Sequence, residues 1–252
     1  MRKHIYTLVF MAVVLTMTTC GPEDYFVTIA GIRPPEEDCT YKPGEVFRAW
    51  GTVDATMITA YQDLGYVAGV QIENRLLNTK DVTKKPGSME ELPMRTDSNI
   101  VVLKRVTVNL RGVVTSANTT LTAPKYSSVY KMEIPETVIP SAGDDKTPGK
   151  AIVLFSLVPK EKFIQMEDSL AEYPTDPTTY LDLMAEFYFE GETLGGVAVK
   201  TNKFNYYIRI CYGCLNYLGG KTPQECMMDS NCTLGGSTCI IGQDGYLLCS
   251  CK

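Results

Sequence analysis

The chain has 252 residues, with 24 Lys or Arg and 29 Asp or Glu, which gives a formal net charge of −5. An acidic chain without a basic stripe is a poor partner for nucleic acid, whose phosphates are bound by clustered Lys and Arg. The only histidine is His4, so the rest of the chain has no Ser-His-Asp or Cys-His catalytic group and no His-containing zinc site. We therefore expect no nucleic-acid partner, no catalytic residue, no metal site and no cofactor, and we predict that the protein is not an enzyme.

Residues 1–19 are predicted to be a lipoprotein signal peptide. A short cationic start at residues 2–4 is followed by a largely apolar run from Ile5 to Met17. About a dozen apolar residues are too few for a stable transmembrane helix but are typical of an export signal. No other run approaches the roughly 18 apolar residues of a transmembrane segment, so the sequence predicts an exported protein.

Cys20, at the end of this signal, resembles the cysteine of a bacterial lipobox, which is lipidated and becomes the new N-terminus. The usual pattern has Gly, Ala or Ser directly before the cysteine, and Thr19 departs from it. The alternative is an ordinary cleaved signal followed by an incidental cysteine. Each buried methylene of a lipid contributes about 0.8 kcal/mol to membrane association. We predict a lipid anchor on Cys20 and a location at the outer membrane or the cell surface.

The number of cysteines agrees with a lipid on Cys20. The chain has nine cysteines, an odd number that would leave one thiol unpaired in the oxidising environment of an exported protein. With Cys20 lipidated, the others can all pair with one another. These predicted disulfide cysteines are Cys39, Cys211, Cys214, Cys226, Cys232, Cys239, Cys249 and Cys251.

The composition divides the rest of the chain into three parts. Residues 20–43 carry several prolines and acidic residues around one short strand-like patch, Tyr25 to Ile29, and are predicted to be a tether. Residues 44–210 are rich in Val, Thr, Tyr, Ile and Phe, with turn residues at short intervals, which indicates an all-β sandwich or barrel. We predict a mainly β fold, an antiparallel β-sandwich of immunoglobulin-like or similar type. A cysteine-rich module follows at residues 211–252.

Four strands of this sandwich can be placed from the apolar pattern. Two of them are expected at Tyr66 to Leu76 and at Ile100 to Arg111. Ala151 to Val158 is almost continuously apolar, which predicts a central strand buried on both faces. Thr179 to Glu190 has apolar residues at every second position, which indicates a strand with one face in the core.

The connections between these strands can also be predicted from the sequence. Residues 190–196, with the sequence EGETLGG, are expected to form a hairpin. The apolar alternation changes phase around Thr201 to Lys203, where we expect a bulge or a short break. One helix is predicted at Pro159 to Tyr173, where Phe163 and Ile164 begin an apolar stripe and proline opens the first turn. We expect this short helix to cross over the edge of the sandwich.

The C-terminal module from Cys211 to Lys252 holds seven cysteines and many glycines but few apolar residues. Such a segment cannot build its own core and has to be held by disulfides, each of which stabilises a fold by about 2–4 kcal/mol. An odd number of cysteines cannot pair completely within the module. Once Cys20 carries a lipid, Cys39 is the only partner outside it, so we predict a bridge from Cys39 to the module. The other pairings stay open.

Cys211 and Cys214 form a CxxC pair with three interpretations. A thioredoxin-like redox pair requires a helix N-terminus after a parallel strand, where the dipole lowers the thiol pKa. A zinc site would combine the pair with two later cysteines, although zinc ribbons are mostly intracellular. Structural disulfides suit an oxidising environment best, and we favour this third interpretation.

Four segments of the chain carry a family resemblance. They are GTVDATMITAYQDLGYVAGVQIENRL (residues 51–76), RTDSNIVVLKRVTVNL (95–110), GETLGGVAVKTNKFNYYIRICYGCL (191–215) and CIIGQDGYLLC (239–249). Together they resemble uncharacterised cysteine-rich surface lipoproteins of myxobacteria and related Gram-negative bacteria. The resemblance implies a lipid-anchored surface protein with a β domain and a cysteine-rich tail, and it carries over no catalytic residue.

The sequence as a whole predicts a non-enzymatic, lipid-anchored cell-surface protein with a binding, structural or assembly role. The membrane would be one partner, through the lipid on Cys20, and a further protein or glycan partner stays open. One alternative is a CxxC-dependent thiol redox protein or a zinc protein with cysteine ligands only. Another is a carbohydrate-binding β-sandwich that uses exposed aromatic side chains, unless these form a buried core. The candidates are Trp50, Tyr61, Tyr206 and Tyr207.

Overall fold

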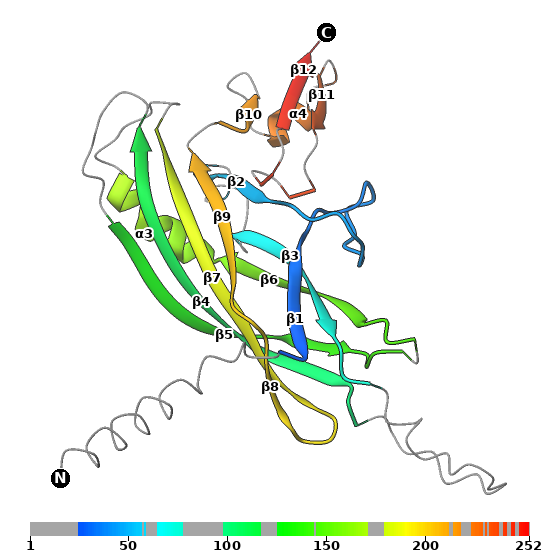
Figure 1. Cartoon of the computed structure of the whole chain (residues 1–252). Helices are drawn as coiled ribbons and strands as arrows, with labels where there is room; N and C mark the ends of the chain where they lie inside the picture. Colours follow the sequence, from blue (N-terminus) through cyan, green and yellow to red (C-terminus); the bar gives the residue numbers. More distant parts are fainter. Residues whose placement is uncertain are drawn as a thin grey trace, which may run out of the picture.

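The computed structural model of the chain (Figure 1) describes most of the two predicted domains. The described residues are 25–56, 58, 65–77, 98–116, 125–143, 145–170, 179–211, 214–217, 223–228, 230, 232–236, 239–240, 243–244 and 247–251. The predicted signal peptide, Cys20 and Tyr61 lie outside these ranges. Among the helices of the described residues, none is long and apolar enough to cross a membrane.

The larger of two packed sheets has the strand order β2-β9-β7-β4-β5, with β8 paired to β7. Its neighbours are antiparallel except for β2 and β9, which run parallel. The strands are β2 (Trp50–Asp54), β4 (Val101–Ser116), β5 (Lys125–Ile139), β7 (Thr179–Thr193), β8 (Ala198–Lys200) and β9 (Phe204–Cys211).

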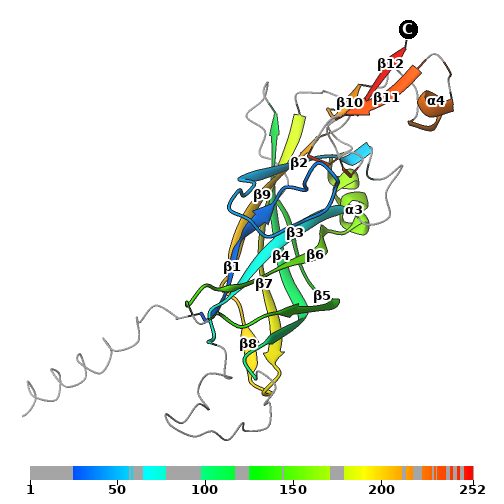
Figure 2. The same cartoon turned by 90° about the vertical axis from the view of Figure 1, so that its right-hand side faces the viewer.

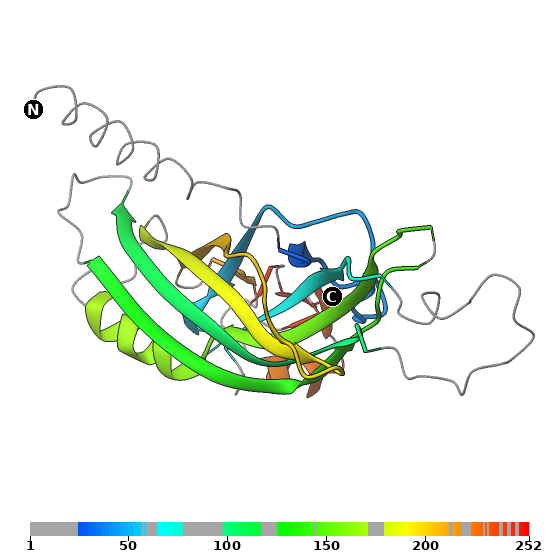
Figure 3. The same ribbon diagram turned by 60° about the horizontal axis from the view of Figure 1, so that its bottom comes forward.

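The smaller sheet is antiparallel, with the order β1-β3-β6. Its strands are β1 (Val27–Arg33), β3 (Tyr66–Asn74) and β6 (Gly149–Val158). Figure 3 shows the long strands of the larger sheet curving along one side of this smaller sheet. The predicted mainly β fold with two packed sheets is confirmed.

The core lies between the two sheets and joins them through aromatic rings. The apolar alternation predicted in β7 is confirmed, because every second side chain from Leu181 to Phe189 is buried. The ring of Phe155 on β6 lies edge-on to Phe187 at 5.7 Å and to Phe189 at 5.4 Å between centroids. Edge-to-face contacts at these distances are favourable beyond the burial of apolar area alone. The strict alternation in β7 therefore positions Phe187 and Phe189 for the contacts between the two sheets.

The position predicted for the strand at Ala151 to Val158 is wrong. This segment forms β6, which pairs only with β3 and so lies at an edge of the smaller sheet. Its side chains alternate, with Val153 buried and Leu154 47% exposed. A continuous apolar run does not by itself distinguish a strand buried on both faces from an edge strand.

The predicted tether at residues 20–43 is also wrong from Tyr25 onward. Residues 27–33 form β1, which pairs with β3 and buries Val27 and Ile32 in the core. The buried guanidinium of Arg33 donates from Nε to the backbone oxygen of Lys42 at 2.9 Å. The fold therefore begins before residue 44, because strand pairing and Arg33 hold this segment against the sandwich.

The predicted helix is present as α3 (Lys160–Leu170). Phe163 and Met166 point into the core, whereas Ile164, predicted to belong to the buried stripe, is 48% exposed. Residues 171–173, the predicted last turn, lie outside the described part of the chain.

The expected break at residues 201–203 separates β8 from β9. There the hydroxyl of Thr201 accepts the backbone N–H of Phe189 at 3.0 Å. This side-chain bond replaces a strand pairing and allows the alternation to change phase.

The C-terminal module forms a third, small sheet at one end of the sandwich. Its order is β10-β12-β11, and its elements are β10 (Asn216–Tyr217), α4 (Pro223–Met228), β11 (Cys232–Gly236) and β12 (Leu247–Cys251). Figures 1 and 2 place this module at the end opposite β8 and the start of β1. The two ends of the sandwich therefore carry different structures.

Candidate binding site

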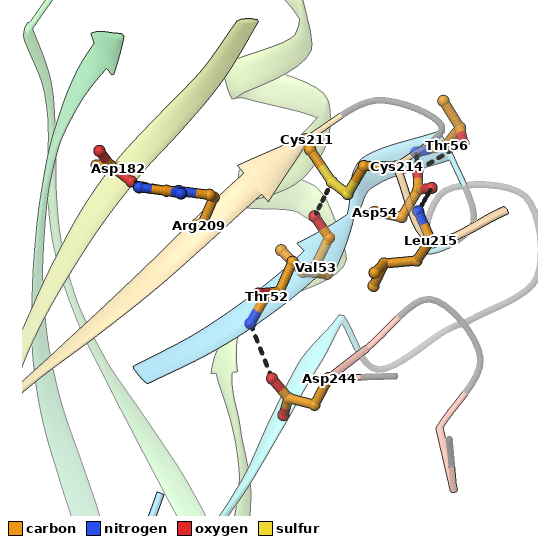
Figure 4. Close-up of a disulfide and its surroundings, with 10 residues drawn as sticks. All are labelled: Thr52, Val53, Asp54, Thr56, Asp182, Arg209, Cys211, Cys214, Leu215 and Asp244. Atoms are coloured by element: carbon orange, nitrogen blue, oxygen red, sulfur yellow. Dashed lines mark hydrogen bonds and ion pairs between the residues drawn. A yellow bond between two sulfur atoms is a disulfide. The ribbon is translucent and has the colours of Figure 1, made fainter. Parts of the chain in front are cut away.

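The CxxC pair closes the end of β9. Cys211 and Cys214 are joined in a disulfide, and Sγ of Cys211 lies 3.4 Å from the backbone oxygen of Val53 on β2 (Figure 4). The buried carboxylate of Asp54 accepts the backbone N–H of Leu215 at 3.1 Å. The turn that follows β9 is therefore tied to β2, and the pair takes the structural arrangement favoured from the sequence.

A second disulfide joins Cys39 to Cys239 over a sequence separation of 200 residues. This is the predicted bridge from the N-terminal segment to the module. Cys226 is also disulfide-bonded, whereas the side chains of Cys232, Cys249 and Cys251 lie outside the described part of the structure. Within that part, no cluster of three or more His, Cys, Asp or Glu side chains has the arrangement of a metal site.

Gln243 and Asp244 dock the module onto both sheets of the sandwich. The side-chain amide of Gln243 accepts the backbone N–H of Val67 on β3 at 2.9 Å and donates to its backbone oxygen at 2.5 Å. Asp244 accepts the backbone N–H of Thr52 on β2 through Oδ1 at 2.8 Å, and its own N–H donates to the Thr52 oxygen at 2.8 Å. One dipeptide thus links the smaller sheet to the larger one.

The carboxylate of Asp244 lies in a buried polar cluster. It forms an ion pair with Arg48 at 2.6 Å and accepts the hydroxyl of Tyr66 at 2.9 Å. Burial raises the pKa of Asp244, an effect that the Arg48 guanidinium opposes. Burial also raises the pKa of Tyr66 and of Tyr206, whose hydroxyls lie 3.2 Å apart. This cluster has its hydrogen bonds satisfied internally, which is typical of a structural junction.

A groove on the outer face of the larger sheet differs from this junction because its side chains are open to solvent. Trp50 on β2 pairs directly with Tyr207 on β9, so both rings project from neighbouring strands about 4.8 Å apart. Each of these two side chains is 57% exposed. They line a groove of about 430 Å³ together with Asp182, Ile208 and Arg209.

Two charged groups stand beside the aromatic pair. Arg209 on β9 donates from Nε to Oδ1 of Asp182 on β7 at 3.1 Å, and Figure 4 shows the two side chains pointing toward each other. The Arg209 guanidinium also lies 3.9 Å from the ring centre of Tyr180. Stacking and the ion pair hold Arg209 in one orientation. The groove therefore offers flat apolar rings next to fixed donors and acceptors.

Of the four aromatic residues proposed for a carbohydrate site, the structure describes three. It brings Trp50 and Tyr207 together on the surface. Tyr206 is wrongly assigned to this group, because its side chain is 1% exposed and packs against Tyr66 in the core. The sequence interpretation missed Asp182 and Arg209, although both occupy outward positions in alternating strands, which is the signal that could have found them.

Comparison of the chain with protein-family models, with curated proteins and with solved structures gives no match.

Proposed function

We propose that this chain is a lipid-anchored cell-surface protein with a binding role, and that its ligand is a carbohydrate held in the groove of Trp50 and Tyr207. The observation that carries the proposal is the direct pairing of these two exposed rings on neighbouring strands. Aromatic side chains that remain in water at a paired position contribute little to the core and suit a binding role. The protein itself is proposed to have no catalytic activity.

A carbohydrate fits the chemistry of the groove better than a highly charged ligand. The C–H groups on one face of a sugar ring carry partial positive charge and pack on the negative face of an aromatic ring. The hydroxyl groups around the sugar both donate and accept, and the Arg209–Asp182 pair offers both functions. This ion pair is neutral overall, so it gives no preference for a polyanion. The groove volume of about 430 Å³ lies within the usual range of roughly 300–1,000 Å³ for small-ligand sites.

The carbohydrate proposal is tested by the fluorescence of Trp50, which is the only tryptophan of the chain. The protein is screened on an array of neutral oligosaccharides, and each hit is titrated while the tryptophan emission is recorded. The variants Trp50→Ala and Tyr207→Ala are expected to weaken binding at least about tenfold, which corresponds to a loss of ~1.4 kcal/mol. Because the Trp50→Ala variant has no tryptophan, its binding is measured on the oligosaccharide array and not by fluorescence.

The matched control is Phe26→Ala, which removes an exposed aromatic side chain directly before β1, and Figure 1 shows the start of β1 at the end of the sandwich opposite the module. It is expected to bind as the wild type does. Failure of every oligosaccharide to bind, or equal binding by wild type and Trp50→Ala, would disprove the carbohydrate site.

The lipid anchor is tested separately by metabolic labelling with palmitate. The label is expected on the wild-type protein and is expected to disappear in Cys20→Ala. An unlabelled wild-type protein would contradict the anchor and leave the groove unaffected. A thiol count on the isolated protein tests the alternative of a CxxC redox or zinc protein, since a complete set of disulfides leaves no free dithiol for either.

A further inference from the structure

A second surface of the molecule is apolar, and it lies at the end opposite the cysteine-rich module. Four exposed side chains form it, and we refer to them as the apolar tip. They are Phe26 (61% exposed), Leu77 (53%), Leu194 (51%) and Val197 (64%). A monomeric domain exposes single apolar side chains routinely, whereas a group at one end suggests contact with an apolar partner.

Several backbone contacts bring the segments of the apolar tip together. Phe26 and Val197 line one groove of about 400 Å³, which Asn99 also lines. The amide of Asn99 donates to the backbone oxygen of Leu77 at 2.7 Å. Leu194 donates its backbone N–H to the oxygen of Ile100 at 2.8 Å. The tip is therefore one surface made by the start of β1, the end of β3 and the β7–β8 hairpin.

The chain itself indicates what faces this surface. Cys20 precedes Tyr25, the first described residue, by five residues. Five residues span at most about 18 Å when fully extended. Tyr25 also lines the groove at the tip. A lipid on Cys20 would therefore hold the apolar tip, and not the module, next to the bilayer.

The side chains at the tip suit the surface of a bilayer. Phe, Leu and Val partition into the region between head groups and acyl chains. Among the described residues that line the groove, Lys200 is the one charged side chain, and there is no acidic one. A lysine at that place complements the phosphates of lipid head groups.

We propose that the apolar tip inserts shallowly into the bilayer that carries the Cys20 lipid, so that the sandwich stands with its module and its Trp50 groove away from the membrane. This inference rests on the proposed lipid anchor. The lipid would supply the attachment, and the tip would supply a protein contact that sets the orientation.

The experiment places a tryptophan at the tip and measures its depth. The Leu194→Trp variant is made in a Trp50→Phe background, purified with its lipid, and reconstituted into phosphatidylcholine vesicles with or without bromine on the acyl chains. Bromine quenches only indoles that reach the acyl region. The emission of the Leu194→Trp variant is expected to shift to the blue and to be quenched. A Val197→Trp variant repeats the measurement in case the first change disturbs the hairpin.

Two controls carry the tryptophan at the opposite end. They are the wild type, with Trp50, and Met228→Trp in the Trp50→Phe background, since Met228 is 81% exposed on α4. Neither is expected to be quenched. Vesicle-bound protein whose tip tryptophans at both positions are unquenched would overturn the insertion and leave the anchor standing. A wild-type protein that does not float with vesicles would overturn the anchor and this inference together.

Discussion

The side chain of Gln243 pairs with the backbone of Val67 as a neighbouring strand would. Its amide accepts the Val67 N–H at 2.9 Å and donates to the Val67 oxygen at 2.5 Å. The next residue, Asp244, makes an equivalent pair of hydrogen bonds with Thr52 on the other sheet. A short piece of the cysteine-rich module thus closes strand edges of both sheets, which otherwise would expose unpaired backbone groups.

Replacement of Gln243 tests this link. Gln243→Ala leaves the N–H and the oxygen of Val67 without their partner, and an unsatisfied buried polar group costs about 1–3 kcal/mol. We expect the free energy of unfolding in urea to fall by that amount. Gln165→Ala, an exposed glutamine on α3, serves as the control and is expected to change it little. Equal stability of the two variants would show that the Val67 pairing contributes nothing.

The Cys39–Cys239 and Cys211–Cys214 disulfides are expected to contribute unequally to the free energy of unfolding. In the chain-entropy model, a disulfide that closes a loop of 200 residues, as Cys39–Cys239 does, stabilises by about 5 kcal/mol, whereas a loop of a few residues gives about 2 kcal/mol. The double variant Cys39→Ser/Cys239→Ser should therefore unfold at much lower urea than Cys211→Ser/Cys214→Ser. The reverse order would mean that the short loop stabilises the junction at β9 by more than loop entropy.

Alkaline pH should unfold the protein through its buried tyrosines. Burial raises the pKa of Tyr66 and of Tyr206 above 10.0, the usual value for tyrosine. A raised folded-state pKa contributes stability that is fully present below about pH 10 and is lost as the pH rises further, because only the unfolded chain can then release these protons. We expect part of the phenolate absorbance to appear together with the loss of circular dichroism. If all phenolate formed before that loss, the burial of these hydroxyls would be contradicted.

Phenylalanine variants identify the tyrosines that carry this effect. Tyr206→Phe is expected to shift the alkaline unfolding midpoint upward, because it removes one buried group that ionises on unfolding. Tyr207→Phe, at the adjacent exposed position, is the matched control and should leave the midpoint where it is.

Gly51 is a position where any side chain should be harmful. A Cβ there would overlap the hydroxyl of Tyr66 and lie 2.7 Å from its Cζ atom. Gly51→Ala is therefore expected to displace Tyr66 from Asp244 and to lower the thermal midpoint, with a cost of about 1–3 kcal/mol typical of overpacking. Gly195→Ala, in the exposed β7–β8 turn, is the control and is expected to cost less, because a Cβ there would come no closer than 3.2 Å to a neighbouring atom. An unchanged midpoint for Gly51→Ala would show that Tyr66 can move without cost.

The elements that could be predicted from the sequence are those with one buried and one exposed face. β7 alternates at every second residue, so its start at Thr179 and its buried face follow from its pattern, whereas the strand continues to Thr193, beyond the predicted end at Glu190. β5 was missed because it is an edge strand with many polar residues and contains Pro135. Proline has no N–H to donate and is tolerated at an edge or a bulge, so there it does not end a strand.

The candidate binding groove was only half predictable. Trp50 was an obvious candidate as a lone tryptophan, but its pairing with Tyr207 depends on a parallel contact between strands far apart in the chain. No local pattern encodes such a contact. The bridge from Cys39 to the module followed from cysteine parity, whereas the docking of Asp244 depends on a left-handed backbone, with φ of 57°, and on partners from two distant segments, residues 48–52 and Tyr66.

The Cys39–Cys239 bridge also decides how the molecule would respond to mechanical force. Tension applied between the N-terminal segment and the C-terminal module would pass through this covalent bond and bypass the strands from β2 to β11. The bypassed 200 residues correspond to about 700 Å of extended chain, and none of that length could be drawn out while the bond is intact. Only β1 and β12, which lie outside the bridged loop, would be peeled from their neighbours. The sandwich is thus protected against pulling as long as its environment stays oxidising.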